Sequence, residues 1–302
     1  MSNPLVSIAI PAYKASFIKE AINSALNQTY SNIELVIVDD CSPEKIDEIV
    51  HGFNDPRIRY YRNEKNIGAK DPSKNWNKCL EYAKGDFFSL LCDDDTYEPT
   101  FVEEMLRLQQ EFPNVKVFRA RAKTIDEENH TINWYPSSPK FESCIDYMYQ
   151  KMAGFRRQTI SEFLYATNFI RAQGGYTNMP RAWTADSLSI YKFSLENGIA
   201  STSNFLVNFR ATSKNISSIY SDAIDKRDAI LLFKKKIELF IMKTSNSDHR
   251  KLLTEALDQF VYTEIYCLCT HASIFNIFRI IFKREVLKIL RSRFFTFRKN
   301  RQ

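Results

Sequence analysis

The sequence predicts an α/β fold in which a doubly wound, mostly parallel sheet is followed by a helical extension. Continuous apolar runs typical of buried strands alternate with segments of helical periodicity over roughly the first 120 residues. This alternation produces parallel strand pairing with helices on both faces of the sheet. Helical patterns then dominate from about residue 222 to the end. We therefore expect an α/β domain over 1–220 and a helical extension over 221–302.

The expected elements follow one another in a regular order. Strands are expected at 6–10, 33–38, 57–61, 87–91 and 115–119. Helices are expected at 17–27, 43–50, 73–84, 100–111 and 187–197. Ser42 and Pro43 suit the N-cap and first position of the second helix, and Gly85 is typical of the end of the third. Residues 120–180 show no clear periodicity, and the pattern assigns no helix or strand there.

Carboxylates stand where two of the predicted strands end. Asp93, Asp94 and Asp95 follow the strand at 87–91, and Asp39 and Asp40 end the strand at 33–38. The carboxyl ends of parallel strands meet at one edge of a sheet, where α/β proteins bind their ligands. Adjacent carboxylates repel one another unless a cation is bound. Oxygen ligands of this kind favour Mg²⁺ or Mn²⁺ that carries a phosphate-bearing substrate.

The composition narrows the choice of function. The chain has only 7 Gly in 302 residues and contains neither of the glycine-rich phosphate-binding motifs, so a metal held by carboxylates would take the place of a glycine loop. The six cysteines follow no disulfide or zinc spacing. There is no signal-peptide layout and no apolar run of about 18 residues. A cytoplasmic location is expected.

Five segments recur in the order and spacing of a known family. They are Val6–Tyr13, Glu34–Asp40 with Ser42, Asn66–Gly68, Ala83–Gly85 and Leu91–Pro99. Together they resemble the family 2 inverting glycosyltransferases, over about residues 5–215. The resemblance implies the nucleotide-diphospho-sugar transferase fold called GT-A, a UDP-sugar donor and a divalent cation, Mn²⁺ or Mg²⁺.

The resemblance assigns donor-binding roles to residues at the first two strand ends. Pro11 and Tyr13 would pack on the nucleobase, and stacking of this kind contributes about 1–3 kcal/mol. Asp39 and Asp40 would recognise the uracil, whose imide N–H can donate to a carboxylate, and Asp40 is the favoured partner. Two structural alternatives stay open. Tyr13 could simply cover the core, and one of the two acids could cap the helix at 43–50.

Residues 93–95, the acidic turn, would hold the metal. Asp93 is expected to bind the ribose or share the metal, Asp94 to bind the metal directly, and Asp95 to bind it or to cap the next helix. Cys92 stands where the family usually has its first acid. The division of roles among the three acids is therefore open.

Inverting transfer also requires a base on the acceptor side of the sugar. The family places it after a Gly-Gly-aromatic turn, which is residues 174–176 here, and this implies Asp186 as the catalytic base. The glutamate that usually precedes the base is replaced by Ala185. The alternative role for Asp186 is to cap the helix at 187–197.

Two further residues have implied roles in substrate binding. Trp183 would be a platform for a sugar ring, or else pack in the core. Arg210 lies in a segment, 208–217, that resembles the family's closing loop, and its guanidinium would contact the diphosphate. A surface loop without that role is the alternative.

The basic residues are concentrated at the end of the chain. Residues 271–302 hold nine Lys or Arg and one acid, Glu285, while the whole chain carries +6. Apolar residues there share one helical stripe: Phe275, Phe278, Phe282, Val286, Ile289 and Leu290. This pattern favours a helix that lies on an anionic membrane, although a core-packed helix with a solvated basic face is the alternative. No nucleic-acid partner is expected, because no recognised module is present.

The sequence therefore predicts a metal-dependent inverting glycosyltransferase that moves a sugar from a UDP-sugar to a hydroxyl of a lipid-linked glycan. We expect it as a peripheral protein on the inner face of a bacterial plasma membrane, in capsule, O-antigen or similar polysaccharide assembly. Two alternatives remain. A nucleotidyltransferase would be expected to have a basic, Gly-rich loop near the first strand. Cys92 and Ala185 also leave open an inactive family member that binds a membrane or a partner.

Overall fold

A computed structural model describes residues 3–213, 215, 218–244 and 246–290. The chain divides into two compact units. The first comprises Met1–Cys144, Arg157–Asn178 and Ala185–Thr212, and the second comprises Ile145–Arg156, Met179–Thr184 and Ser213–Gln302. The main boundary therefore lies at 212–213, and two short segments before it belong to the helical unit.

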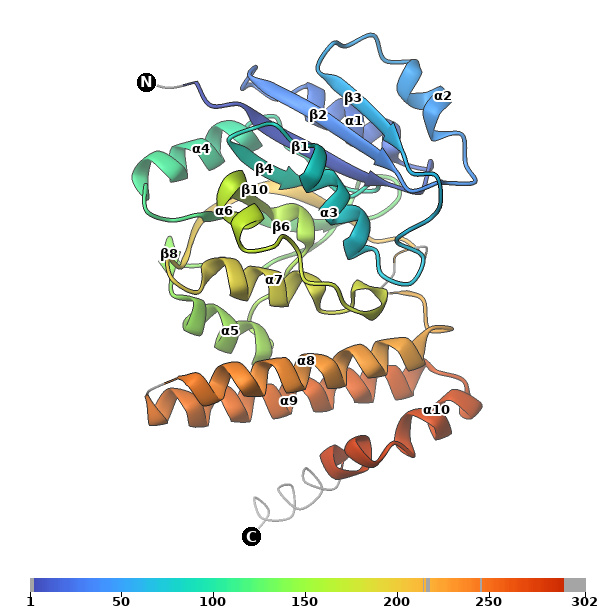
Figure 1. Ribbon diagram of the computed structural model, residues 1–302, viewed down its shortest axis with the longest axis vertical. Coiled ribbons are helices and arrows are strands. Elements are labelled where there is room, and N and C mark those ends of the chain that lie inside the picture. The colour runs from blue at the N-terminus through green and yellow to red at the C-terminus, as the bar shows by residue number, and fades with distance from the viewer. Residues whose placement is uncertain (1–2, 214, 216–217, 245, 291–302) are drawn as a thin grey trace. The chain divides into compact units, whose positions relative to one another are not determined.

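One half of the sheet in the first unit is parallel (Figure 1). Its strands lie side by side in the order β3 (Ile58–Arg62), β2 (Ile33–Asp39), β1 (Val6–Ala12) and β4 (Phe87–Leu90). Every residue of β2, and every residue of β1 except Pro11, is buried. Strands covered on both faces require apolar side chains on both faces, which is why these segments were recognisable as continuous apolar runs.

The other half of the sheet contains antiparallel strands that the sequence did not reveal. β9 (Phe163–Ala166) pairs antiparallel with both β4 and β6 (Val117–Ile125), and β10 (Ile199–Arg210) runs parallel to β6. Three short strands complete the sheet: β5 (Thr96–Tyr97), β7 (Thr131–Trp134) and β8 (Phe141–Glu142). The predicted loop at 208–217 was wrong in its first residues, because Asn208–Arg210 lie in β10.

The predicted helices of the first unit are present, one of them with a different start. Those near their expected bounds are α1 (Ile18–Leu26), α3 (Ser73–Tyr82), α4 (Phe101–Glu111) and α7 (Ala185–Ser194). α2 spans Ile46–His51, so it does not begin at Pro43 and Ser42 is not its N-cap. The Ser42 hydroxyl instead donates to the carbonyl of Tyr13 at 2.6 Å and accepts the N–H of Glu44 at 3.0 Å.

Short helices fill the part of the chain that showed no periodicity. They are α5 (Cys144–Met152), η1 (Ile160–Glu162), α6 (Thr167–Ala172) and η2 (Pro180–Ala182). In the first unit, α1 and α4 pack their apolar faces on the sheet. Ile22 and Met105 join Ile8, Leu35 and Phe118 in one buried core. This packing fixes the ends of β1, β2 and β4 beside one another.

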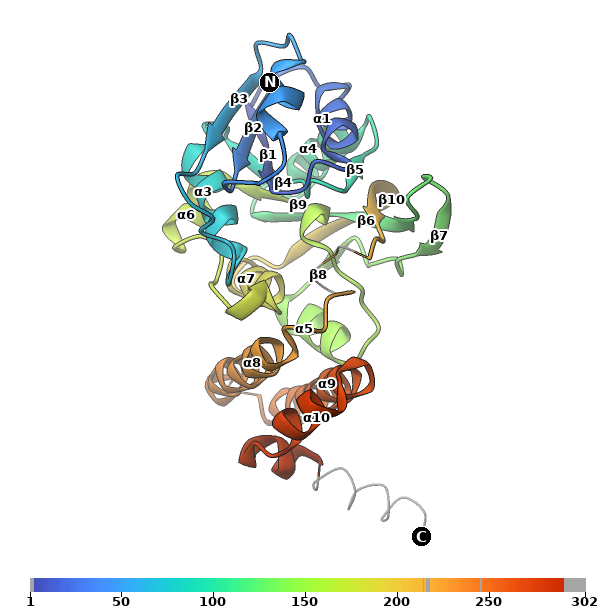
Figure 2. The same cartoon turned by 90° about the vertical axis from the view of Figure 1, so that its right-hand side faces the viewer.

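Long helices of the second unit follow the first unit in the chain (Figure 2). α8 (Ala223–Lys243) and α9 (Ser247–His271) lie side by side, and α10 (Ile274–Ile281) follows. Arg227 of α8 donates to the carbonyl of Arg279 at 2.6 Å, which ties α10 to α8. Residues 284–290 are again helical, and 291–302 of the predicted tail lie outside the described residues. Within the described ranges, no helix is both long enough and apolar enough to cross a bilayer.

Candidate active site

Asp93 links the acidic turn to the end of β1 by hydrogen bonds. Its Oδ2 accepts the N–H of Tyr13 at 2.8 Å and the N–H of Lys14 at 2.7 Å. Burial raises the pKa of the Asp93 carboxyl, and the positive charge of Lys14 opposes that shift. The turn after β4 and the loop after β1 are therefore built as one structure.

Lys14 brings a positive charge directly to this turn. Its ammonium donates to Oδ2 of Asp94 and lies 3.5 Å from Oδ1 of Asp93. Burial lowers the pKa of Lys14, but attraction to Asp93 and Asp94 outweighs it, so the pKa lies above its ordinary value. A cation is thus already in contact with the carboxylate that the sequence assigned to the metal.

Asp95 is fully buried. Its carboxylate accepts the Ser161 hydroxyl at 2.7 Å and the backbone N–H of Arg210 at 3.0 Å. Burial, and next the charge of Asp94, raise the pKa of Asp95 to about 8. The alternative in which Asp95 caps the next helix is wrong, because the residue before α4 is Thr100.

The acidic turn fits a divalent ion. Ligand atoms of Cys92, Asp94 and Asp95 all lie within 4.8 Å of one another. Burial raises the pKa of the Cys92 thiol, which keeps it a poor partner for a hard ion. Mg²⁺ and Mn²⁺ are commonly held by one or two carboxylates together with substrate phosphates, and Asp94 and Asp95 could supply such carboxylates.

A second group of such residues lies outside this turn. Among the residues the structure describes, Asp126, Glu128 and His130 also bring ligand atoms within 4.8 Å of one another. The Asp126 carboxylate accepts the N–H groups of Glu128 at 3.1 Å and His130 at 2.8 Å. These bonds form the turn between β6 and β7, so a structural role accounts for the cluster.

Asp39 and Asp40 are both held by donors of their own chain. Asp39 accepts the N–H of Ser42 and the Tyr60 hydroxyl, each at 2.7 Å. Asp40 accepts the N–H of Ile67 at 2.9 Å and of Gly68 at 2.7 Å. Each acid therefore orders a loop at the sheet edge.

Neither Asp39 nor Asp40 caps α2, whose N-cap residue is Lys45. Tyr13 is 43% exposed as a whole residue, so it is not part of the buried core. Pro11 is partly buried within β1. Nucleobase packing by Pro11 and Tyr13, and uracil reading by either acid, remain predictions.

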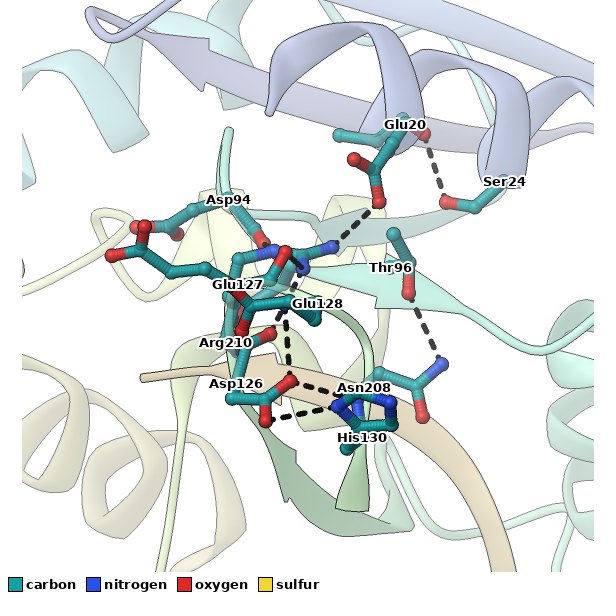
Figure 3. Close-up of polar contacts among 12 residues, drawn as sticks. Glu20, Ser24, Asp94, Thr96, Asp126, Glu127, Glu128, His130, Asn208 and Arg210 are labelled. Atoms are coloured by element: carbon teal, nitrogen blue, oxygen red, sulfur yellow. Dashed lines mark hydrogen bonds and ion pairs between the residues drawn. The ribbon is translucent and has the colours of Figure 1, made fainter. Parts of the chain in front are cut away.

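Arg210 is fully buried and braces the acidic turn (Figure 3). Its Nε donates to the carbonyl of Asp94 at 3.0 Å, Nη1 to the carbonyl of Asp126 at 3.1 Å, and Nη2 to the Glu20 carboxylate at 2.7 Å. These bonds fix the backbone of Asp94. Contact of Arg210 with a diphosphate remains a prediction.

A short segment of the first unit connects Asp186 with the acidic turn. The Gln158 amide donates to Oδ2 of Asp186 at 2.6 Å. Three residues later, Ser161 bonds Asp95 and also accepts the N–H of Cys92 at 3.1 Å. Three residues span about 10 Å at most, so Asp186 is tied closely to the turn. Asp186 is the second residue of α7 and not the residue before it, so the capping alternative is wrong.

A buried ion pair supports this segment. Arg119 of β6 donates to the Glu162 carboxylate at 2.6 Å, and both side chains are almost fully buried. Glu162 also accepts the N–H of Thr159 at 3.1 Å in a capping box that opens η1. Sequence reasoning found neither this pair nor Gln158. It also missed Lys14, although the position of Lys14 directly after Tyr13 was a signal for it.

Trp183 belongs to the second unit. Its indole N–H donates to Glu264 at 3.0 Å, and the Lys226 ammonium lies 4.6 Å from the ring centre. Thr184 next to it has φ of 64°, a strained conformation for a side chain branched at Cβ. The ring is held in place by these contacts, and its role as a sugar platform remains a prediction.

The fold and the site define a protein of the GT-A glycosyltransferase class. The structure matches that of S. aureus TarS 1–349 in complex with UDP-GlcNAc with a TM-score of 0.69, at 16% identity over 88% of this chain and 80% of that one. It also matches the mannosyltransferase PcManGT from Pyrobaculum calidifontis in complex with GDP-Man and Mn²⁺, with a TM-score of 0.60 at 13% identity over 91% and 77%. At such identities the likeness shows the fold.

Sequence comparison gives the family. The family model described as Glycosyl transferase family 2 matches residues 7–173, more than half of the chain. The chain belongs to glycosyl transferase family 2, which argues against the nucleotidyltransferase alternative.

The chain is also similar to putative polysaccharide-biosynthesis glycosyltransferases and to an uncharacterized glycosyltransferase. A putative teichuronic acid biosynthesis glycosyltransferase, TuaG of Bacillus subtilis, is 26% identical over 71% of this chain and 82% of its own length. A putative colanic acid biosynthesis glycosyl transferase, WcaA of Escherichia coli, is 33% identical over 46% and 51%. An uncharacterized glycosyltransferase of Rickettsia typhi is 34% identical over 43% and 40%. The chain thus spans about half or less of the length of the last two.

Proposed function

We propose that this chain is a metal-dependent inverting glycosyltransferase that moves a sugar from a UDP-sugar to a hydroxyl of a lipid-linked glycan during surface-polysaccharide synthesis. One observation carries the proposal. The acidic turn at 93–95 is bonded to the loop that presents the exposed Tyr13, and the 158–161 segment links the same turn to Asp186. Donor, metal and base residues thus belong to one connected structure.

The comparisons support the donor and the metal. TarS is solved with UDP-GlcNAc, and PcManGT with GDP-Man and Mn²⁺. In this chain Asp94 and Asp95 would hold the ion, with Asp95 giving up its proton. A bound divalent cation offsets the negative charge that develops on the diphosphate leaving group.

Asp186 would act as the base. The acceptor hydroxyl attacks the anomeric carbon from the face opposite the nucleotide, and its proton passes to the carboxylate as the new glycosidic bond forms. Gln158 fixes the orientation of that carboxylate by its bond to Oδ2. Asp93 and Arg210 hold the backbone of the turn, so that Asp94 is oriented before the donor binds.

Release of UDP tests this function. The full chain is incubated with Mn²⁺ and a panel of UDP-sugars, with and without a polyprenyl-diphosphate glycan acceptor, and GDP-mannose is the comparison donor. We expect UDP to be released from at least one UDP-sugar, to stop on chelation and to resume when Mn²⁺ is restored. Release only from GDP-mannose would overturn the choice of nucleotide, and release that is insensitive to chelator would overturn the role of the metal.

The acceptor and the location are proposed from α10 of the second unit. Phe275, Phe278 and Phe282 are 70%, 57% and 71% exposed, and Ile274 is 75% exposed. Val286 from the predicted stripe is buried, so the exposed apolar surface is formed by the phenylalanines together with Ile274. Lys283, Arg284 and Lys288 follow directly. Aromatic anchors beside basic residues fit an anionic bilayer surface, where a lipid-linked acceptor is found.

Liposome sedimentation tests the membrane proposal. We expect the Phe275→Ser/Phe278→Ser variant to lose most of its binding to vesicles that contain anionic lipid, since two apolar anchors are removed. Met242→Ser is the control, because Met242 is 72% exposed but lies at the opposite end of the α8–α9 pair. Equal sedimentation of both variants and the parent protein would remove the membrane claim.

A further inference from the structure

The acidic turn already contains a positively charged group of the protein itself. The Lys14 ammonium contacts the Asp94 carboxylate and lies 3.5 Å from that of Asp93. Both carboxylates are almost fully buried, while the Lys14 side chain is partly exposed. The lysine therefore neutralises a turn that would otherwise hold adjacent unscreened negative charges, and it retains a route to solvent.

Arg210, which also contacts Asp94, does not replace Lys14 in this role. The Arg210 guanidinium is directed to backbone carbonyls and to Glu20 of α1, and its contact with Asp94 is through the main chain. The side chain of Asp94 is paired with Lys14 instead. Removal of Lys14 would therefore leave this carboxylate without its ion pair.

A divalent ion bound at Asp94 would share the carboxylate that Lys14 already contacts. An ion bound to Asp94 would lie about 2.1 Å from its carboxylate oxygen, within a few ångströms of an ammonium in contact with the same group. At that separation in a buried setting, repulsion between like charges is strong. Occupation of Asp94 by both cations at once is therefore disfavoured.

We infer that Lys14 competes with the divalent ion for Asp94, and that metal binding displaces its ammonium from the acidic turn. This inference rests on the proposed metal role of Asp94. The lysine keeps the turn formed while no metal is bound, at the expense of metal affinity. Metal and donor would then bind together more readily than metal alone, because the diphosphate supplies negative charge that Lys14 does not cancel.

Mn²⁺ affinity tests the inference without any activity measurement. Free Mn²⁺ is followed by electron paramagnetic resonance as the full chain is titrated with the metal alone. We expect Lys14→Met to bind Mn²⁺ about tenfold more tightly than the parent protein, or better. Lys14→Arg keeps the charge and should not gain affinity. Lys19→Met removes an equal charge from an exposed position of α1 and should behave as the parent.

A second measurement uses the unmodified chain, in case Lys14→Met fails to fold. The ε-amino groups are acetylated sparsely, and the labelling of Lys14 is compared with that of Lys19 by peptide mass spectrometry. We expect saturating Mn²⁺ to increase the relative labelling of Lys14, because its ammonium leaves the carboxylates. Labelling that is unchanged or reduced would overturn the inference.

The outcomes separate this inference from the proposed function. If Asp94→Asn abolishes Mn²⁺ binding while Lys14→Met binds like the parent, the metal site stands and the competition is refuted. If neither the parent nor Lys14→Met binds Mn²⁺, both are refuted. If Lys14→Met binds Mn²⁺ tightly and the parent binds it weakly, the competition is supported.

Discussion

Replacement of Asp186 by asparagine is expected to reduce the turnover number about 10²- to 10⁴-fold, the usual contribution of a general base. Asparagine preserves the size of the side chain and can still bond Gln158, but it cannot take a proton from the acceptor hydroxyl. Binding of the UDP-sugar, measured by calorimetry, should remain close to that of the parent protein. The loss should therefore fall on turnover and not on donor affinity.

A matched substitution controls for the change of charge. Asp47→Asn removes a carboxylate from α2 of the same unit, at a position with no contact to the acidic turn, and should leave turnover unchanged. If Asp186→Asn retained a turnover number within a few-fold of the parent, the base would have to be another residue. A large loss of donor affinity would instead indicate that Asp186 serves the donor site.

Replacement of Arg119 by methionine is expected to lower the free energy of unfolding by about 3–5 kcal/mol. The substitution leaves the Glu162 carboxylate buried without its cation. The guanidinium also donates to the Ser138 hydroxyl at 2.8 Å and to the carbonyl of Arg157 at 2.6 Å, and these bonds are lost too. Urea-induced unfolding of the full chain measures the change.

Arg107→Met is the matched control for this prediction. Arg107 pairs with Glu104 at 2.6 Å on the surface of α4, where its side chain is 55% exposed, compared with 3% for Arg119. Exposed pairs contribute about 0–1 kcal/mol. Equal destabilisation by the two substitutions would show that the buried pair does not hold the 157–162 segment. A double variant, Arg119→Met/Glu162→Met, should recover part of the loss, because it removes both buried charges.

The sequence predicted the parallel half of the sheet because local pattern and burial coincide there. β1 and β2 are covered on both faces, so nearly every residue in them is apolar. β10 was missed because Ser, Thr and Asn occupy positions 201–204, so the strand shows no continuous apolar run, although only 203 and 204 of these four are exposed. Its end carries Arg210, which is why that residue was misplaced in a loop.

The candidate site was predictable only where its residues follow one another in sequence. The turn at 93–95 was recognised from three adjacent acids after an apolar strand. Its partners come from elsewhere: Ser161 bonds Asp95 across 66 positions, and Lys14 bonds Asp94 across 80. Such pairings result from tertiary packing, so local periodicity does not predict them. Arg119 and Glu162, 43 positions apart, were missed for the same reason.

Diffraction from crystals grown with Mn²⁺ and UDP tests the central claim most directly. The anomalous signal of manganese locates the ion independently of the protein density. We predict a manganese peak within about 2.5 Å of a carboxylate oxygen of Asp94, with the diphosphate on the same ion and the uracil beside Tyr13. A manganese peak at Asp126, Glu128 and His130 instead, or a nucleotide bound away from the end of β1, would contradict the account.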